Sequence, residues 1–427
     1  MYDVIVIGAR VAGSSTAMLL ARNGLSVLAV DKAAFPSDTL STHQVQLPGV
    51  ARLERWGLLR EVAAAGTPAT RRVRFDPGPA VLDGRYGEFE GVDALYSPRR
   101  TLLDTLLVES AREAGAEVRE GFKVDEIVIE DGRVTGVRGR PPGDSPVVES
   151  ARIVIGADGR HSLLARTLAP RAYHEQPALT FAYYTYWDGL EIGGGGEMYG
   201  RARRLIGAWP TNDSLVMTYV AGPIDEFHAF RSDLEGNLLA SLDLAGDLGE
   251  RAREATRAER IYGTANTANY FREPYGPGWA LVGDAGLAMD PVTGQGISDA
   301  LRDAELLANA ITTGLGGSQP LETALGEYQQ ARDQAVKPMY DFTLDVASLS
   351  PPELEQQLLF KALQRDPHQT QRFLGVLTGA VPVGEFFSPS NLRSLIGLRG
   401  FAKIAASRLR PRRSVHVAGA ARAVTAP

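Results

Sequence analysis

The sequence predicts an α/β protein in which a parallel-sheet domain of the doubly wound, Rossmann type is interleaved with an antiparallel sheet and followed by helices. Residues 4–7 form an uninterrupted β-branched run that ends at Gly8, which is typical of a strand buried on both faces of a parallel sheet. Residues 181–188 alternate two sets of side chains, as an antiparallel strand with two different faces does. After residue 319 the pattern is mostly helical.

Composition limits the possible functions. The chain has 427 residues, of which 44% are hydrophobic and 22% are charged, so we expect two interlocked globular domains. Lys and Arg number 45 against 51 Asp and Glu, a net charge of -6, and no basic stripe with interleaved aromatic residues is present, so nucleic acid is not an expected partner. With no cysteine the chain has no disulfide, thiolate metal site or dithiol, and no metal site is predicted. Any redox chemistry must therefore come from a cofactor.

The N-terminus enters a strand at Asp3 without a charged leader, and nowhere do eighteen apolar residues run together. We therefore expect a cytoplasmic protein without integral membrane association. Its oligomeric state is left open.

The first elements form a β-turn-α-β unit that ends in an acid. A helical pattern over residues 13–22 stops at Asn23-Gly24, and an apolar strand over residues 26–30 ends at Asp31. The turn from Gly8 to Gly13 precedes a helix whose N-terminal amides favour a pyrophosphate. Asp31 lies 18 residues beyond Gly13, where a carboxylate accepts hydrogen bonds from ribose hydroxyls.

Arg10 occupies the turn position at which a second glycine normally lets the backbone approach the pyrophosphate. Two alternatives follow. Either its side chain points away from the cofactor, or its guanidinium adds a positive charge near the phosphates.

The following elements are also expected. Residues 101–114 are predicted to be a helix, 124–129 and 134–137 a hairpin around Asp131-Gly132, and 153–155 a buried strand. Residues 205–209 and 215–220 extend the antiparallel sheet, and 225–246 suggest one amphipathic helix against it. The late helical region is expected to break at Pro351-Pro352 and Pro389. We expect cofactor-domain parts at 1–70, 96–172 and 271–345, substrate-domain parts at 71–95 and 173–270, and a C-terminal helical segment at 346–427.

Two further motifs resemble those of the class A flavoprotein monooxygenases, the para-hydroxybenzoate hydroxylase-like superfamily. Residues 152–162 contain Asp158-Gly159 and are similar to its Asp-Gly motif, which is associated with FAD and the incoming nicotinamide cofactor. Gly283-Asp284-Ala285, followed by Pro291 and Gly294-Gln295-Gly296, resembles its Gly-Asp motif. The resemblance spans roughly residues 1–345, and it implies an FAD-binding domain with a three-stranded meander.

The resemblance also assigns roles in FAD binding. Asp284 at a strand end would bind ribityl hydroxyls, and residues 294–297 would open a helix beneath the flavin pyrimidine edge, where glycine amides stabilise negative charge. Arg100 resembles the Arg of a helix start that contacts the cofactor, although it also fits a plain helix-surface cation, and Val124 falls where a meander backbone meets adenine. The residues predicted to bind FAD are Gly8, Arg10, Ala12, Gly13, Asp31, Lys32, Arg100, Val124, Asp158, Gly159, Gly283, Asp284, Pro291, Gly294, Gln295, Gly296 and Ile297.

The chain departs from the family pattern at two places. The closing Arg of the Asp-Gly motif falls at Ala165, with an Arg only at 166, and the usual Ala-His pair of the Gly-Asp motif is Gly286-Leu287. The first departure weakens the inference that NAD(P)H docks in the family's manner.

Candidates for chemistry and substrate binding come from two regions. His43 follows the second strand in the region that the resemblance places beside the flavin, and it is our candidate catalytic residue; a histidine that ties down a loop is the alternative. Tyr184 and Tyr186 lie on one face of a strand and Phe181, Tyr183 and Trp187 on the other, so one face should be core and the other can floor a pocket. Tyr184, Tyr186 and Trp209 are the predicted substrate-binding residues.

The resemblance implies an FAD-dependent monooxygenase that uses NAD(P)H as a transient co-substrate and O2. Through a flavin C4a-hydroperoxide it would hydroxylate an aromatic or polycyclic small molecule. An ene-reductase similar to geranylgeranyl reductases is the main alternative, although that group normally has a cysteine motif. A flavin-dependent halogenase would have a Lys and a Trp-x-Trp-x-Ile-Pro run, of which residues 205–210 keep only the final aromatic-proline pair. A flavin-binding protein without turnover is a further alternative.

The last feature is a basic stretch. Residues 391–413 contain seven Arg or Lys and no acid. A solvated helix end explains them, and an anionic membrane or partner surface is the alternative.

Overall fold

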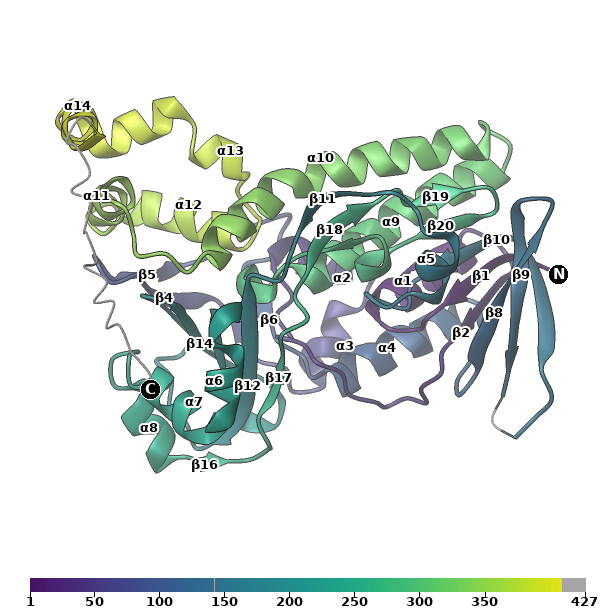
Figure 1. Cartoon of the computed structure of the whole chain (residues 1–427), viewed down its shortest axis with the longest axis horizontal. Coiled ribbons are helices and arrows are strands. Elements are labelled where there is room, and N and C mark those ends of the chain that lie inside the picture. The colour runs from purple at the N-terminus through teal and green to yellow at the C-terminus, as the bar shows by residue number, and fades with distance from the viewer. Residues whose placement is uncertain (142, 409–427) are drawn as a thin grey trace, which may run out of the picture.

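The structure is a computed structural model that describes residues 1–141 and 143–408. A mixed sheet lies at the centre of the half that contains the N-terminus (Figure 1). Its strands run in the order β19-β20-β10-β1-β2-β7, and all neighbours are parallel except β19 and β20. The bounds are β1 (Tyr2–Ile7), β2 (Val27–Val30), β7 (Glu117–Arg119), β10 (Val147–Gly156), β19 (Tyr275–Gly276) and β20 (Trp279–Leu281).

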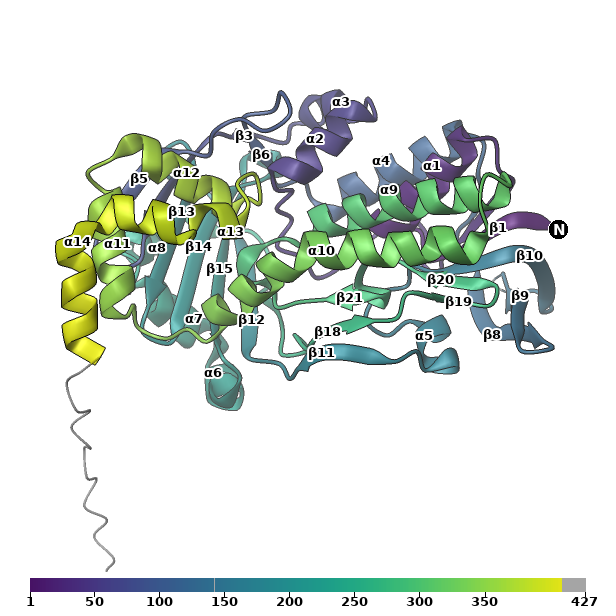
Figure 2. The same cartoon turned by 90° about the horizontal axis from the view of Figure 1, so that it is seen from above.

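Both faces of this sheet are covered, which explains the apolar runs of its strands. In β1, Ile5 lies opposite Val154 of β10 and Leu28 of β2, and all three are fully buried. On one face α1 packs against α4 and α9, and α10 packs on α9 (Figure 2). These helices and their neighbours are α1 (Val11–Arg22), α2 (Leu47–Arg55), α3 (Leu59–Ala64), α4 (Arg100–Glu113), α9 (Gly296–Leu315) and α10 (Leu321–Ala347).

The other face carries a three-stranded meander and a short helix. β8 (Lys123–Glu130), β9 (Arg133–Arg140) and the first half of β10 pair antiparallel in succession, and α5 (Leu163–Leu168) packs beside them. Asp131 and Gly132 turn the β8-β9 hairpin with φ of 49° and 76°, the two positive values that a tight type I′ turn requires. The predicted Rossmann-type domain with a meander is confirmed.

A second sheet forms the other half of the molecule. Its strands run in the order β16-β12-β15-β14-β13-β4-β5, with β17 also paired to β12. The bounds are β4 (Arg72–Asp76), β5 (Leu82–Arg85), β12 (Thr180–Asp188), β13 (Gly196–Arg201), β14 (Arg204–Pro210), β15 (Val216–Pro223), β16 (Thr256–Arg257) and β17 (Tyr262–Thr264). Small ladders complete the strands: β3 (Ala69–Thr70) with β6 (Leu95–Tyr96), and β11 (Ala172–Gln176) with β18 (Asn269–Arg272) and β21 (Leu287–Ala288).

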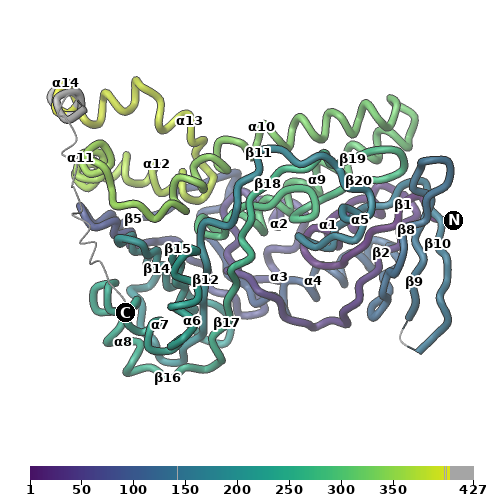
Figure 3. Tube along the Cα trace, viewed as in Figure 1, coloured from purple at the N-terminus to yellow at the C-terminus, as the bar shows by residue number. Residues whose placement is uncertain are grey.

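The chain passes between the two halves several times. The trace in Figure 3 leaves the first half after α3, runs through β4 and β5 at the edge of the second sheet, and returns at α4. It leaves again at β11 and β12 and returns at β18. The border between the two halves is therefore formed by segments from distant parts of the sequence.

The predicted single helix over residues 225–246 is wrong. The structure has α6 (Phe227–Ser232) and α7 (Leu234–Leu242), followed by α8 (Leu248–Glu254). The break falls at Asp233, whose backbone is not helical and whose carboxylate accepts a hydrogen bond from the Gly236 amide as the N-cap of α7. These helices cover the face of β12 that carries Phe181 and Tyr183.

The C-terminal region is helical and lies beside the second sheet (Figure 2). It consists of α11 (Leu354–Leu363), α12 (Pro367–Leu377), α13 (Val383–Phe386) and α14 (Pro389–Arg408). The predicted break at Pro351-Pro352 is present, further breaks precede Pro367 and Val383, and Pro389 is the first residue of a helix. Residues 409–413 of the predicted basic stretch lie outside the described residues.

In residues 1–141 and 143–408, none of the helices combines the length and the apolar character needed to cross a membrane.

Candidate functional site: a crevice joined to an apolar cavity

A crevice of about 810 Å³ lies at the carboxyl ends of the first sheet. The residues that follow β1, β2 and β10 all reach it, as ligand sites of open α/β sheets do. Of the predicted cofactor residues, those that line it are Gly8, Arg10, Ala12, Asp31, Lys32, Arg100, Val124, Asp158, Gly159, Gly283, Asp284, Pro291, Gly294, Gly296 and Ile297. Gly13 and Gln295 do not.

Gly13 acts through backbone packing. A Cβ atom there would lie 1.8 Å from the carbonyl oxygen of Gly8, so a side chain cannot fit between the turn and α1. Gly8 itself has φ of +99°, and a Cβ on it would lie 2.6 Å from the Ala157 oxygen. The turn therefore needs both glycines, and it presents the N-terminus of α1 to the crevice.

Asp31 fastens the end of β2 to the turn. One carboxylate oxygen accepts a 2.7 Å hydrogen bond from the Ala9 amide and the other accepts a 2.8 Å bond from the Ala33 amide. Each oxygen keeps a further lone pair, so the carboxylate can still accept hydrogen bonds from ribose hydroxyls in the crevice.

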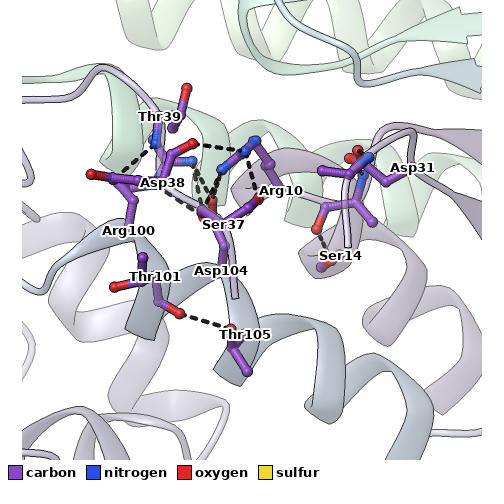
Figure 4. Close-up of polar contacts among 12 residues, drawn as sticks. Arg10, Ser14, Asp31, Ser37, Asp38, Thr39, Arg100, Thr101, Asp104 and Thr105 are labelled. Carbon is purple, nitrogen blue, oxygen red and sulfur yellow. Dashed lines mark hydrogen bonds and ion pairs between the residues drawn. The ribbon is translucent and has the colours of Figure 1, made fainter. Parts of the chain in front are cut away.

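The side chain of Arg10 points toward α4 and the segment after β2 (Figure 4). Its Nη1 donates to Asp104 Oδ2 at 2.6 Å, and its Nη2 donates to the Ser37 hydroxyl at 2.9 Å and to the Asp38 carbonyl oxygen at 3.1 Å. Arg100 shares the fully buried Asp104 carboxylate, with Nε and Nη2 contacts of 2.9 to 3.0 Å. Two arginines at the crevice are thus held by one aspartate, and Arg100 is not a plain surface cation.

Asp158 begins the turn after β10. Its Oδ2 accepts a 2.7 Å bond from the Leu163 amide, whereas its Oδ1 is buried and has no partner among the described residues. Burial raises the pKa of this carboxyl, partly offset by the hydrogen bonds from Ser162 and Leu163. A hydroxyl donor in the crevice would satisfy the remaining oxygen.

Asp284, after β20, forms an ion pair of 3.2 Å with Arg160. Arg160 also donates to the carbonyl oxygens of Asn266, Ala268 and Met289, so it connects the Asp-Gly turn to the segment before β18 and to the residue after β21. Nothing in the sequence patterns singled out Arg160. The crevice also contains Arg166, one position beyond the place where the family's closing Arg is expected.

The segment before α9 is fixed by Asp290. Its carboxylate accepts hydrogen bonds from the Thr180 hydroxyl and the Val292 amide, and Gly294 then adopts φ of +64°. α9 begins at Gly296, where an added Cβ would meet open space. Gly296 and Ile297 of this helix start line the crevice, and Asp299 in its first turn has a buried Oδ2 without a partner in the described chain. Gln295 instead donates to the carbonyl oxygens of Thr293 and Leu377.

A second cavity, of about 600 Å³, lies between the second sheet and the C-terminal helices. Its wall is mostly apolar and combines β4, β13 and β14 with α10, α11, α12 and α13. Thr42, Tyr219, Pro291 and Gly294 line both this cavity and the crevice, so the two spaces share a wall. The predicted substrate residue Trp209 lines the apolar cavity, and Tyr184 lines the crevice.

His43 and Tyr186 line neither space. His43 is fully buried at φ of 60°, and its Nε2 shares a short hydrogen bond with the Tyr186 hydroxyl. Burial, followed by the charges of Arg100 and Arg99, holds the pKa of His43 well below its usual range. The Arg99 guanidinium lies 3.9 Å from the centre of the Tyr186 ring. These contacts match the loop-anchoring alternative for His43, and the anchored loop carries Thr42, whose carbonyl oxygen accepts a hydrogen bond from the Trp209 indole.

The crevice fits FAD by several independent features. The turn at Gly8 and the start of α9 present helix N-termini at two places, as the pyrophosphate and the flavin pyrimidine edge of FAD require. Asp31 offers lone pairs to a ribose, and the orphaned oxygens of Asp158 and Asp299 need hydroxyl donors. Gly159 and Gly296 leave their Cβ positions open to ligand. The fold and this crevice together define an FAD-binding flavoprotein of the Rossmann type.

Comparisons with known proteins agree. Residues 1–183 match the model of the FAD binding domain family. FixC of Salmonella typhi is 34% identical over 180 residues, and this match spans 39% of each protein. Kynurenine 3-monooxygenase of Salinispora arenicola is 28% identical over 385 residues, which are 83% of this chain and 80% of that protein.

Two further relatives have other activities. Digeranylgeranylglycerophospholipid reductase 1 of Methanococcoides burtonii is 26% identical over 73% of this chain and 74% of the reductase. The solved structure of the flavin-dependent brominase Bmp2 superposes with a TM-score of 0.77 at 18% identity, covering 96% of this chain and all of the brominase. These matches place an FAD binding domain in residues 1–183, and they agree with an FAD-dependent oxidoreductase whose motifs resemble those of the class A flavoprotein monooxygenases.

Proposed function

We propose that the protein is an FAD-dependent monooxygenase that hydroxylates an apolar aromatic or polycyclic molecule, using NAD(P)H and O2. The shared wall between the crevice and the apolar cavity carries this proposal. A substrate in a cavity of about 600 Å³ would lie directly beside the cofactor across Thr42, Tyr219, Pro291 and Gly294. Ligand cavities for molecules of drug size have roughly 300–1,000 Å³.

FAD would supply hydride acceptance and the activation of O2 for oxygen transfer. The residues of the chain supply the surroundings. Phe342, Phe360, Phe373 and Phe387 line the apolar cavity, where they would keep water away from a bound substrate. The start of α9 places amide dipoles at the crevice, where they stabilise negative charge on a bound flavin.

Two observations weigh against the alternatives. A halogenase of this fold would place a lysine at the substrate site, and none of the described residues that line the apolar cavity is a lysine. An ene-reductase of the geranylgeranyl reductase type normally has a cysteine motif, and this chain has no cysteine. Because a reductase is among the relatives, the ene-reductase alternative is included in the test.

The test is a set of measurements on FAD-loaded protein with a panel of polycyclic phenols and ketones. A monooxygenase oxidises NADH or NADPH faster when an effective compound is bound, consumes O2 and places one atom of ¹⁸O from ¹⁸O2 in the product. Oxidation of NAD(P)H that does not need O2 and that adds two hydrogen atoms to a carbon–carbon double bond of the test compound would identify an ene-reductase. Product formation only with externally reduced flavin and a halide would identify a halogenase, and protein stripped of FAD is the control.

A further inference from the structure

Tyr219 occupies a special place in the wall between the two spaces. It lies on β15, it is 3% exposed, and it lines both the crevice and the apolar cavity. Its ring lies 6.0 Å from that of Trp209 on the neighbouring strand β14. No pattern in the sequence indicates a role for it.

The hydroxyl of Tyr219 is buried and has no hydrogen-bond partner in the described part of the chain. Three other polar side chains at the apolar cavity are bonded within the protein: Thr293 to Thr343, Gln46 to Gln44, and Trp209 to the Thr42 carbonyl oxygen. Among the described residues that line this cavity, only Tyr219 has a buried side-chain polar atom without a partner. Since buried polar groups are almost always satisfied, a bound molecule is the natural source of the missing partner.

The protonation state of Tyr219 determines what its hydroxyl can offer to such a partner. Burial raises its pKa well above the usual value, and the nearby Asp290 carboxylate raises it further. The phenol is therefore neutral at physiological pH, and its O–H is available as a donor.

We propose that Tyr219 donates a hydrogen bond to an oxygen atom of the substrate. This inference rests on the proposed function, because it takes the apolar cavity as the substrate site. It narrows the substrate class to ring-containing apolar molecules that carry a carbonyl or phenolic oxygen. Since the bond would fix this oxygen at the shared wall, it would also select which part of the ring system faces the crevice.

The experiment compares two probes with one skeleton, 9-fluorenone and fluorene, on FAD-loaded protein. Equilibrium dialysis gives the Kd of each. We expect the wild-type protein to bind fluorenone about 3–10-fold more tightly than fluorene, the value of one net hydrogen bond. Tyr219→Phe should remove this preference by weakening fluorenone alone. Tyr183→Phe is the matched control, because it removes a phenol from the face of the same sheet that packs on α6 to α8.

Each other outcome overturns the inference. A preference that survives in Tyr219→Phe, or wild-type protein that binds neither probe, would contradict it. Because the hydroxyl has no protein partner, Tyr219→Phe should fold and retain FAD; a variant that does not fold would show that the hydroxyl is structural. The proposed function can fail separately. If the preference depends on Tyr219, but neither fluorenone nor any compound of the wider panel stimulates NAD(P)H oxidation or O2 uptake, the Tyr219 contact is supported and the monooxygenase is contradicted.

Discussion

At the scale of single residues, buried polar groups hold the loop that borders both spaces. His43 connects this loop to Tyr186, and Arg10 connects it to α4 through Ser37, Asp38 and Asp104. The segment from residue 35 to 46 is thus fixed at both ends. Its middle supplies Thr42 to the shared wall.

His43 should make stability depend on pH. Its pKa is lowered in the folded protein, so the unfolded chain, with a pKa of about 6.5, binds the proton more readily. The stability linked to neutral His43 is complete above this pH and is lost as the pH falls below it. Urea unfolding at pH 7 and pH 5.5 should show a loss of up to about 1.4 kcal/mol per pH unit from this group.

The variant His43→Gln keeps a donor for Tyr186 but does not titrate, so its loss of stability between the two pH values should be smaller than that of the wild type. His228→Gln, at an exposed position of α6, is the control. An identical pH dependence in the wild type and His43→Gln would refute the assignment.

Arg10 should affect both stability and cofactor binding. Arg10→Met removes four hydrogen bonds to Asp104, Ser37 and Asp38, and we expect it to lower the free energy of unfolding by about 1–3 kcal/mol and to weaken FAD binding. Arg112→Met on α4 removes only the partly exposed pairs with Glu109 and Glu120, and it should cost about 0–1 kcal/mol. Titration with FAD measures the second effect, and unchanged affinity in Arg10→Met would show that the guanidinium does not shape the site.

The candidate site could be predicted only in part at this scale. The glycines and aspartates of the cofactor motifs were found because their spacing within a β-turn-α unit is local. Asp104 could not be found, since its partner Arg10 is 94 residues away and its own helix suggests only an i,i+4 pair with Arg100. No sequence pattern predicted a role for Tyr219 either, because its position between the two spaces depends on how the two halves of the molecule pack together.

At the scale of elements, the chain bends just before α9, and the first residue of this helix has free space beside its Cβ position. Gly294 turns the chain and Gly296 begins the helix with no atom near its Cβ position. We expect Gly296→Ala to leave the stability of the protein equal or slightly higher, because alanine favours helix. It should still weaken FAD binding, because the new methyl group enters the crevice.

Denaturant unfolding without FAD and fluorescence titration with FAD measure the two effects. Gly193→Ala, in a loop of the second half that is equally open at its Cβ, is the matched control and should change neither. A Gly296→Ala protein with wild-type FAD affinity would contradict the placement of the cofactor at this helix.

Strands were easier to predict than helix breaks. The alternation in residues 181–188 and the apolar run of 4–7 are local consequences of burial on one or both faces, and both strands are present. The break at Asp233 was missed because the helical spacing of apolar residues continues across it. The N-cap that begins α7 there depends on one side-chain hydrogen bond, from the Gly236 amide to Asp233. The helical pattern after residue 319 also could not show which faces of α10 to α13 would enclose a cavity.

At the scale of the whole molecule, the interleaved chain brings a cofactor crevice and an apolar cavity to one shared wall. The crevice is lined mainly by the first half, to which the second sheet adds Tyr184 and Tyr219, and the cavity is lined mainly by the second sheet and the C-terminal helices. The motifs alone predicted the first space. The second was predicted only through the substrate candidates Tyr184, Tyr186 and Trp209, of which Trp209 lines the cavity, Tyr184 lines the crevice and Tyr186 lines neither.

A crystal structure of the FAD-loaded protein tests this account most directly. We predict that the isoalloxazine ring lies at the start of α9, in contact with the shared wall of Thr42, Tyr219, Pro291 and Gly294, and that the adenosine lies beside Asp31. An isoalloxazine ring bound away from this wall, with no access to the apolar cavity, would contradict the account.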